Sequence, residues 1–268
     1  MDKPLAGKRI VVTRAPEQAH ELTRTLESLG AEVLAFPTVQ FVPPEDLREL
    51  DKHVANLKGI EAILFFSKNA VRYFSRVLAE LGIKCYSDGS SNCLIAAVGP
   101  GTAREAEANG FRVDIVASEH TGHGLVRELG DRIKGRNVLI PRGDLADDMV
   151  PDELRAAGAR VTQVVVYRNI APEKTDPAIA AQILRGDADA VIFASPSAFH
   201  NFSKILGGAD LLRLSARTQF AAIGPTTAGA LRDAGIRVEI EAPEASPAGL
   251  ADALLKYFQR SSVAGKAS

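Results

Sequence analysis

Short apolar runs of strand length alternate with segments of helical periodicity along most of the chain. After the first run, Leu22, Leu26 and Leu29 recur at helical spacing, and Gly30 supplies a signal for the end of a helix. Strands joined by helices in this rhythm form a parallel sheet covered on both faces, so the pattern predicts an α/β protein. The clearest strand-like runs are 9–13, 31–36, 62–66, 94–98, 137–140 and 190–193.

The second half of the chain repeats the first. Seventeen residues from Ala97 match seventeen from Ala222 at eight positions without a gap, and Arg142 stands 128 residues after Arg14. A repeat of more than a hundred residues excludes a short-period solenoid. It predicts two similar lobes related by internal duplication, with a small-molecule site in the cleft between them.

Composition narrows the class of protein. The 268 residues suit two domains, and 46% hydrophobic with 24% charged residues is an ordinary globular profile. A net charge of −1 argues against nucleic acid and anionic membranes as partners. Cys85 and Cys93 lack the spacing of a zinc site or disulfide framework, so we expect two reduced thiols. With no apolar leader and no spanning run, we expect a soluble, cytoplasmic protein.

Short polar turns follow the predicted strands in both copies, each directly before a predicted helix. Ligands of open parallel sheets bind outside the carboxyl ends of the strands, where helix N-termini offer backbone N–H groups. Hydroxyl groups add donors there, and arginine adds a fork that fits a carboxylate or phosphate. The turns therefore predict an anion-binding surface in each lobe. They contain Arg14, Ser67, Asn69, Gly99, Thr102, Arg142, Ser195, Ser197, Gly224, Thr226 and Thr227.

A structural interpretation competes with binding for these residues. Ser67, Ser195, Thr102 and Thr227 are residue types that cap helices. The glycines of the turns suit backbone geometry as well as ligand contact. No nucleotide-binding glycine loop or nucleophile elbow is present, and no catalytic dyad or metal site is evident. His120 and His123 lie three residues apart, but no cysteine is near them. We therefore expect chemistry that works by holding an anionic substrate in shape.

Several stretches, taken in order, resemble the uroporphyrinogen-III synthase family. The resemblance covers about 7–258, and it lies in the order and spacing of the motifs, because no single motif is specific. The motifs are VVTR at 11–14, LGAEV at 29–33, FSKNAV at 66–71, AVGPGTA at 97–103, PRG at 141–143, VVYR at 165–168, FASPS at 193–197 and IGPTTA at 223–228.

The resemblance implies two flavodoxin-like αβα lobes with parallel sheets, joined by a two-stranded connection. One lobe would hold 1–37 with 171–260 and the other 38–170, with a flexible tail at 261–268. The family closes hydroxymethylbilane, a linear tetrapyrrole with eight carboxylates, into uroporphyrinogen III with inversion of ring D and loss of water. It uses no metal or organic cofactor. The resemblance also suggests a monomer, and a transient contact with the preceding pathway enzyme stays open.

Residue by residue, Tyr167 matches the tyrosine that the family places at its cleft. The resemblance implies that Tyr167 assists departure of the substrate hydroxyl and that the turn residues hold carboxylates. The alternative for Tyr167 is a strand-end tyrosine that packs a crossing between lobes.

Two departures from the family pattern stand out. Ala15 separates Arg14 from the proline that many members place directly after the arginine. Asp147 and Asp148 stand where members often have a second arginine, which puts the binding role of that loop in doubt.

Two other functions stay in view. One is a non-catalytic sensor of an anionic ligand on the same scaffold, although the chain has no room for a DNA-binding domain and no basic stripe. The other is a two-lobed solute-binding protein that closes by a hinge, against which the missing signal peptide argues. A turnover assay separates the enzyme from both.

Overall fold

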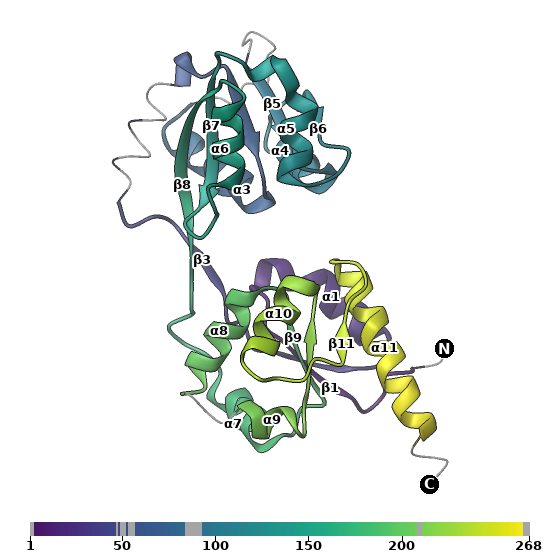
Figure 1. Cartoon of the computed structure of the whole chain (residues 1–268). Coiled ribbons are helices and arrows are strands. Elements are labelled where there is room, and N and C mark those ends of the chain that lie inside the picture. The colour runs from purple at the N-terminus through teal and green to yellow at the C-terminus, as the bar shows by residue number, and fades with distance from the viewer. Residues whose placement is uncertain are drawn as a thin grey trace. The chain divides into compact units, whose positions relative to one another are not determined.

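The computed structural model describes residues 3–46, 48, 52, 57–83, 93–207 and 211–264. Contacts divide the chain into two compact units. Unit 1 comprises Met1–Gln40 with Ile170–Ser268, and unit 2 comprises Phe41–Asn169. The chain thus leaves unit 1 once and returns to it once (Figure 1).

Unit 1 contains a five-stranded sheet of order β11-β10-β9-β1-β2, and every neighbouring pair is parallel. Strand β1 comes from the N-terminus, whereas its neighbour, the central strand β9, comes from the second half of the chain, so Ile10 lies beside Ala190. The strands are β1 (Arg9–Val12), β2 (Glu32–Ala35), β9 (Ala190–Phe193), β10 (Gln219–Ala222) and β11 (Ile240–Glu241). The helices are α1 (Pro16–Ser28), α7 (Pro177–Arg185), α8 (Pro196–Ile205), α9 (Leu211–Ser215), α10 (Pro225–Asp233) and α11 (Pro247–Ala264).

Both faces of this sheet are buried, which explains its continuous apolar strands. Side chains alternate between the faces. One face, with Ile10 and Ile192, packs against leucines of α1 and α11. Aromatic rings gather at Phe193, which lies 5.2 Å from the Phe202 ring of α8 and 5.4 Å from the Phe220 ring, between centroids. Helix α11 reaches Ala264, so half of the predicted flexible tail is helical, and 265–268 lie outside the described residues.

Unit 2 contains a six-stranded sheet of order β3-β8-β7-β4-β5-β6. Pairing is parallel from β8 through β6. The strands are β3 (Gln40–Val42), β4 (Ala62–Phe65), β5 (Leu94–Ala97), β6 (Ile115–Val116), β7 (Asn137–Gly143) and β8 (Arg160–Ile170). The helices are α3 (Lys68–Glu80), α4 (Pro100–Ala108), α5 (Gly122–Leu129) and α6 (Met149–Ala156), with short 3₁₀ turns at Leu57–Gly59 and Gly130–Ile133.

Strand β4 shows how the two faces of the second sheet are covered. Ile63 and Phe65 belong to the apolar cluster around Phe74 of α3. Ala62 and Leu64 point the other way, into the cluster that includes Leu125 of α5. Helices therefore cover both faces, and the predicted α/β fold with parallel sheets is confirmed (Figure 1).

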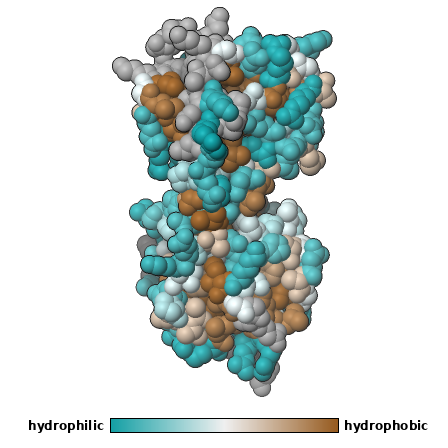
Figure 2. Space-filling model, turned by 90° about the vertical axis from the view of Figure 1, so that its left-hand side faces the viewer, coloured by the Kyte–Doolittle hydropathy of each residue, from teal (hydrophilic) through white to brown (hydrophobic). Residues whose placement is uncertain are grey.

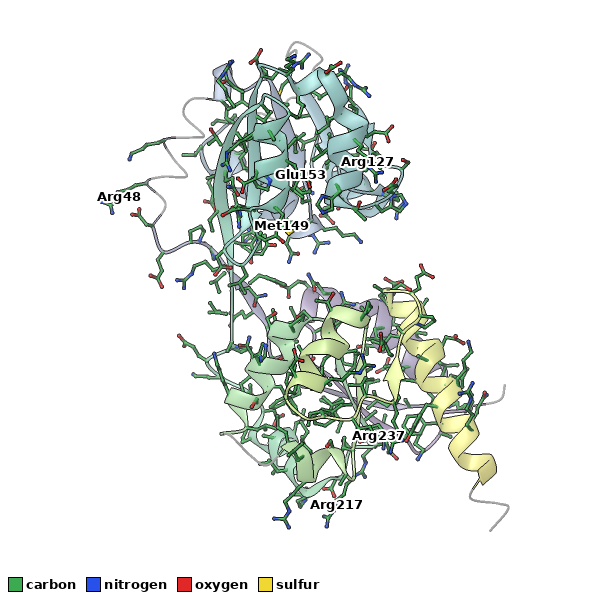
Figure 3. All side chains as sticks on the ribbon, in the orientation of Figure 1. Arg48, Arg127, Met149, Glu153, Arg217 and Arg237 are labelled. Atoms are coloured by element: carbon green, nitrogen blue, oxygen red, sulfur yellow. The ribbon has the colours of Figure 1, made fainter. Side chains whose placement is uncertain are left out.

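Polar groups are left at the ends of the strands. On the face drawn in Figure 2, hydrophobic residues occur among hydrophilic ones, as is normal for protein surfaces. Arg217 and Arg237 precede β10 and β11, so they mark the amino edge of the sheet of unit 1 (Figure 3). The predicted turns lie at the opposite, carboxyl edges. In each unit the direction of strand crossover changes at one point, between β1 and β9 and between β7 and β4, where open sheets bind ligands.

Candidate functional site

Two predicted serines begin helices at these carboxyl edges. Ser67 follows β4 and its Oγ accepts a hydrogen bond from the N–H of Ala70 at 3.0 Å. Ser195 follows β9 and its Oγ accepts one from the N–H of Ala198 at 3.2 Å. The capping interpretation is therefore confirmed for both serines. A capping hydroxyl still has its own proton to donate, so capping does not exclude a ligand.

The two predicted threonines do not cap their helices. The cap positions of α4 and α10 belong to Gly99 and Gly224, and a proline follows each glycine. Neither helix has a side-chain cap, so the N–H groups at its start lack the partner that a capping residue supplies. Thr102 and Thr227 are the third residues of these helices and lie in the first turn, with exposed fractions of 7% and 3%.

Arg14 is an unusual arginine of unit 1. Its neighbour Thr13 is fully buried and donates a hydrogen bond to the carbonyl of Ile192 at 2.6 Å, which fixes the backbone beside β9. The Nε and Nη1 atoms of Arg14 are shielded from solvent and have no hydrogen-bond partner among the described residues. Burial lowers the pKa of its guanidinium, and the charge of Glu21 partly offsets that effect. A partly buried cation with donors that no described residue engages is a site at which an anion is stabilised.

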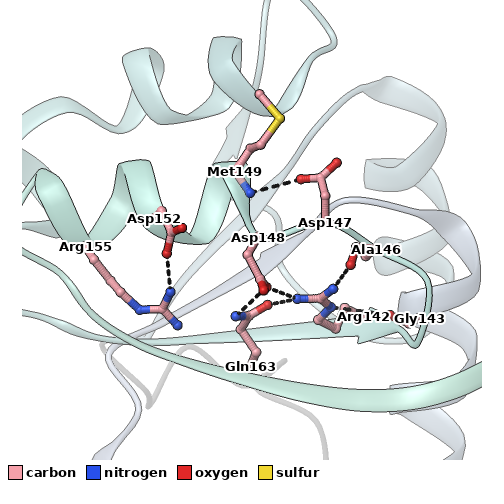
Figure 4. A network of polar contacts seen from close by, with 9 residues as sticks. All are labelled: Arg142, Gly143, Ala146, Asp147, Asp148, Met149, Asp152, Arg155 and Gln163. Atoms are coloured by element: carbon pink, nitrogen blue, oxygen red, sulfur yellow. Dashed lines mark hydrogen bonds and ion pairs between the residues drawn. The ribbon is translucent and has the colours of Figure 1, made fainter. Parts of the chain in front are cut away.

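Arg142 stands at the repeat-related position of unit 2 but has many partners (Figure 4). Its Nη1 bonds the Asp148 carboxylate at 2.6 Å and also the amide oxygen of Gln163. Its Nη2 donates to the carbonyl of Ala146, and its Nε donates to the carbonyl of Gly143 at 3.3 Å. The side chain is only 14% exposed, so most of its donors are already used within unit 2.

Tyr167 lies near the end of β8, half-buried between aromatic rings of unit 2. The ring of Phe41 is 5.5 Å away and that of Tyr73 is 5.4 Å away, between centroids. The hydroxyl of Tyr73 donates to the carbonyl of Phe41 at 2.8 Å. The hydroxyl of Tyr167 lies 3.5 Å from Oγ of Ser67, which is long for a hydrogen bond between hydroxyls. The phenol of Tyr167 is therefore held in place while its proton is only weakly engaged.

The carboxyl edges gather the predicted residues within each unit. In unit 1, Arg14 follows β1, and Ser195 and Ser197 follow β9. The turn with Gly224, Thr226 and Thr227 follows β10. In unit 2, Ser67 and Tyr167 are in contact, and Asn69, 6% exposed, lies in the first turn of α3. Ser197 lies beside Ser195, with 3.0 Å between their hydroxyl oxygens.

A pocket of about 390 Å³ in unit 2 contains residues that the sequence did not single out as ligand-binding. Its wall includes Phe66, His120 and Gln163, together with the predicted Arg142. His120 adopts a positive φ of 51°, rare for a side chain of this kind, and its Nδ1 lies 2.8 Å from the carbonyl of Ala117. In the sequence, His120 stands out only as a possible metal ligand. Its place directly before Thr121 and Gly122, at the start of a helix, is the signal that marks it as a turn residue.

His123 lies apart from that arrangement. Its Nδ1 is 2.6 Å from a carboxylate oxygen of Glu153. Among the residues that the structure describes, no three His, Cys, Asp or Glu side chains are grouped so that they could hold a metal ion. Within the same residues, no helix is long and apolar enough to cross a membrane. Cys93 is buried with a free thiol, and Cys85 lies outside the described residues.

The fold and the polar edges define a parallel α/β protein of two units, in which helix N-termini and basic side chains meet at strand ends. The family model described as "Uroporphyrinogen-III synthase HemD" matches residues 20–252. This chain therefore belongs to the uroporphyrinogen-III synthase family, whose members are cyclising enzymes of heme biosynthesis.

Two curated relatives match along nearly their whole length. The uroporphyrinogen-III synthase of Chlorobaculum parvum is 30% identical over 238 residues, which cover 87% of this chain and 92% of the relative. That of Synechococcus elongatus is 28% identical over 263 residues, covering 97% and 98%. No relative found in these comparisons favours the sensor alternative.

Solved structures support the same fold. The uroporphyrinogen-III synthetase of Helicobacter pylori superposes with a TM-score of 0.63 at 19% identity, covering 93% of this chain and 99% of that one. A mutant uroporphyrinogen III synthase of Thermus thermophilus gives a TM-score of 0.60 at 20% identity, covering 95% and 98%. At these identities the similarity establishes the architecture.

Proposed function

We propose that this chain converts hydroxymethylbilane into uroporphyrinogen III, with Tyr167 as the group that helps the substrate hydroxyl to leave. The phenol donates a proton as the C–O bond breaks, so the hydroxyl departs as water. The pyrrole nitrogen supplies the electron pair, which leaves an azafulvene at the former hydroxymethyl carbon. The substituted α-carbon of ring D bonds to that carbon and forms a spiro intermediate, and its older bond to the carbon that bridges rings C and D breaks. The released bridging carbon then bonds to the free α-carbon of ring D, which loses its proton. The ring proton lost at the end balances the proton taken from the phenol.

The observation that carries this assignment is how weakly the Tyr167 hydroxyl is hydrogen-bonded. Tyr73 has the same group close by, but its proton is used in a 2.8 Å bond to the carbonyl of Phe41. The hydroxyl of Tyr167 has Ser67 at 3.5 Å, so it can turn to a substrate without losing a strong bond. A positioned proton donor of this kind contributes roughly 10²- to 10⁴-fold to a rate.

The turns of each unit supply donors for substrate carboxylates. Arg14 brings a charged fork that matches a carboxylate geometrically, and two of its donors have no partner among the described residues. The uncapped starts of α4 and α10 bring backbone N–H groups and the positive ends of helix dipoles. An octacarboxylate offers partners to all of them. These contacts favour the inverted product when they fit the transition state that leads to the spiro intermediate better than the one for direct closure.

The two units also fit a duplicated flavodoxin-like fold. Reading β2-β1-β9-β10-β11 and β8-β7-β4-β5-β6 gives the same order, 2-1-3-4-5, in both sheets. The sequence repeat pairs β1 with β7 and β4 with β9, so each unit combines the first two strands of one copy with the last three of the other. This exchange supports a chain of two interlocked copies. The monomeric state, the cytoplasmic location and the contact with the preceding enzyme stay predictions, and sedimentation velocity checks the first.

Isomer analysis tests the proposal. Hydroxymethylbilane is generated in situ with the protein present, and the products are oxidised and separated into type I and type III porphyrins. We expect type III from the wild-type chain and a fall in kcat of about 100-fold or more for Tyr167→Phe. Tyr257→Phe removes the same atom from α11 of unit 1 and serves as the matched control. Type I at the unaided rate from the wild type would indicate a binding protein, whereas unchanged kcat in Tyr167→Phe would reject the role of the phenol.

A further inference from the structure

Strand β7 contains an irregularity directly opposite Tyr167. Its pairing with β8 shifts between Arg142 and Gly143, and Gly143 comes to lie beside Tyr167. A Cβ built on Gly143 would lie 2.7 Å from ring carbons Cε2 and Cζ and 2.9 Å from the hydroxyl oxygen. The backbone of Gly143 is not in the left-handed region, so the contact with Tyr167, rather than its own conformation, requires a glycine.

The turn that follows Gly143 is held at both ends. The N–H of Asp144 donates to the carbonyl of Tyr167 at 3.1 Å, and its carboxylate accepts from the N–H of Asn169 at 2.9 Å. Arg142 holds the rest of the turn through the carbonyls of Gly143 and Ala146 and the carboxylate of Asp148. Figure 4 shows the guanidinium enclosed by these acceptors.

Aromatic rings also pack against the phenol. Phe41 meets the ring edge to face at 87°, and Tyr73 lies against it at 36°. The ring is thus enclosed by aromatic groups on one part of its surface and by the backbone of Gly143 on another. Since a catalytic group must be held to within a fraction of an ångström, the backbone on the Gly143 side is part of what sets the hydroxyl position.

We propose that Gly143 and Arg142 are positioning residues for Tyr167, and that Arg142 acts by clamping the turn rather than by binding a substrate carboxylate. The inference rests on the proposed role of Tyr167. It also assigns different tasks to the two arginines of the repeat. Arg14 has two donors that no residue in the described part of the chain engages and that a substrate can use, whereas Arg142 uses its donors within its own turn, with Asp148 as one partner.

A double-mutant cycle tests the part played by Gly143. Gly143→Ala forces the ring to move by about 0.7 Å to reach ordinary contact, and we expect kcat to fall about 10- to 100-fold with little change in KM. In the Tyr167→Phe background the same substitution should change kcat less than twofold, because the hydroxyl that it displaces is gone. Gly59→Ala is the control, since its Cβ would meet nothing within 4 Å and its φ is not positive.

Asp148→Asn tests the clamp without touching the ring. Its side chain is 65% exposed, so the variant is expected to fold, and melting curves check this. A clamp predicts a lower kcat, by about two- to tenfold, at unchanged KM. If KM falls instead, the substitution has freed Arg142 to bind substrate, and the clamp is overturned. Equal effects of Gly143→Ala in both Tyr167 backgrounds would overturn the part played by Gly143.

Failure of this inference is distinguishable from failure of the proposed function. The proposed function fails if the wild-type chain forms no type III product or if Tyr167→Phe retains full kcat. The positioning inference fails when Tyr167→Phe is impaired and Gly143→Ala and Asp148→Asn both turn over at the wild-type rate. Should Gly143→Ala not fold, the kcat and KM of Asp148→Asn decide the matter.

Discussion

Replacing Arg14 by methionine should strengthen the fold and weaken substrate binding at the same time. Methionine keeps an unbranched side chain of similar length and removes the charge. The guanidinium is partly desolvated, and two of its nitrogens are buried without a hydrogen-bond partner among the residues that the structure describes. A buried donor left unsatisfied costs about 1–3 kcal/mol, more when it is charged. We therefore expect Arg14→Met to raise the free energy of unfolding by about 1–2 kcal/mol.

The same substitution should raise KM. A hydrogen bond to a charged group contributes about 1.5–3 kcal/mol, which corresponds to about 10- to 150-fold in affinity. Initial rates at several hydroxymethylbilane concentrations, with unaided closure subtracted, give KM and kcat separately. The control is Arg237→Met, an arginine whose side chain is 88% exposed at the amino edge of the same sheet. A variant with unchanged KM would refute the carboxylate role, and a destabilised variant would show that the guanidinium is satisfied within the folded chain.

Three further results are expected. Arg72 holds the pKa of Glu105 below its usual range by hydrogen bonding, so Glu105→Gln should destabilise the protein by up to about 1 kcal/mol at pH 7. A depressed carboxyl pKa stabilises in full above the unfolded pKa and loses its effect as pH falls through the folded pKa, so that difference should shrink and then disappear as the urea denaturation is repeated at progressively more acidic pH. Burial raises the pKa of Cys93 to about 12, so in a Cys85→Ser background the native protein should resist a thiol reagent at pH 8 and react once unfolded. Phe202→Ala should cost about 3–5 kcal/mol in thermal or denaturant unfolding, since its ring is fully buried against Phe193.

The sequence predicted the fold because its apolar runs are long and continuous. Strands such as Ala62–Phe65 are buried on both faces, which leaves them no polar position to obscure the pattern. The carboxyl-edge turns follow from that order, since every parallel strand ends at the same edge. Local patterns thus predicted the parallel α/β class and the positions of the turns, whereas the division into a continuous and a discontinuous lobe came from the family resemblance.

Other parts of the site depend on contacts that spacing along the chain does not reveal. The sequence favoured Arg142 as a ligand-binding group. It could not show that Gln163, on the neighbouring strand, accepts a hydrogen bond from Arg142. The two aspartates that replace an expected arginine suggested a lost contact, whereas Asp148 is a partner of Arg142. Serine caps its helix but threonine does not, because a glycine takes the cap position of the threonine-containing helices. The sequence alone does not show which residue takes that position.

The order in which the strands are made differs from the order in which they pair. Strand β1 leaves the ribosome first, but its neighbour β9 begins only at Ala190, after the whole of unit 2 has been synthesised. Unit 2 is continuous in sequence, and chain segments that lie close together meet sooner than distant ones. We therefore expect unit 2 to fold during translation, before the first forty residues can pair with the rest of unit 1. The apolar segment Ile10–Val12 is then exposed in the nascent chain, where a chaperone or slow translation before β9 would protect it from aggregation.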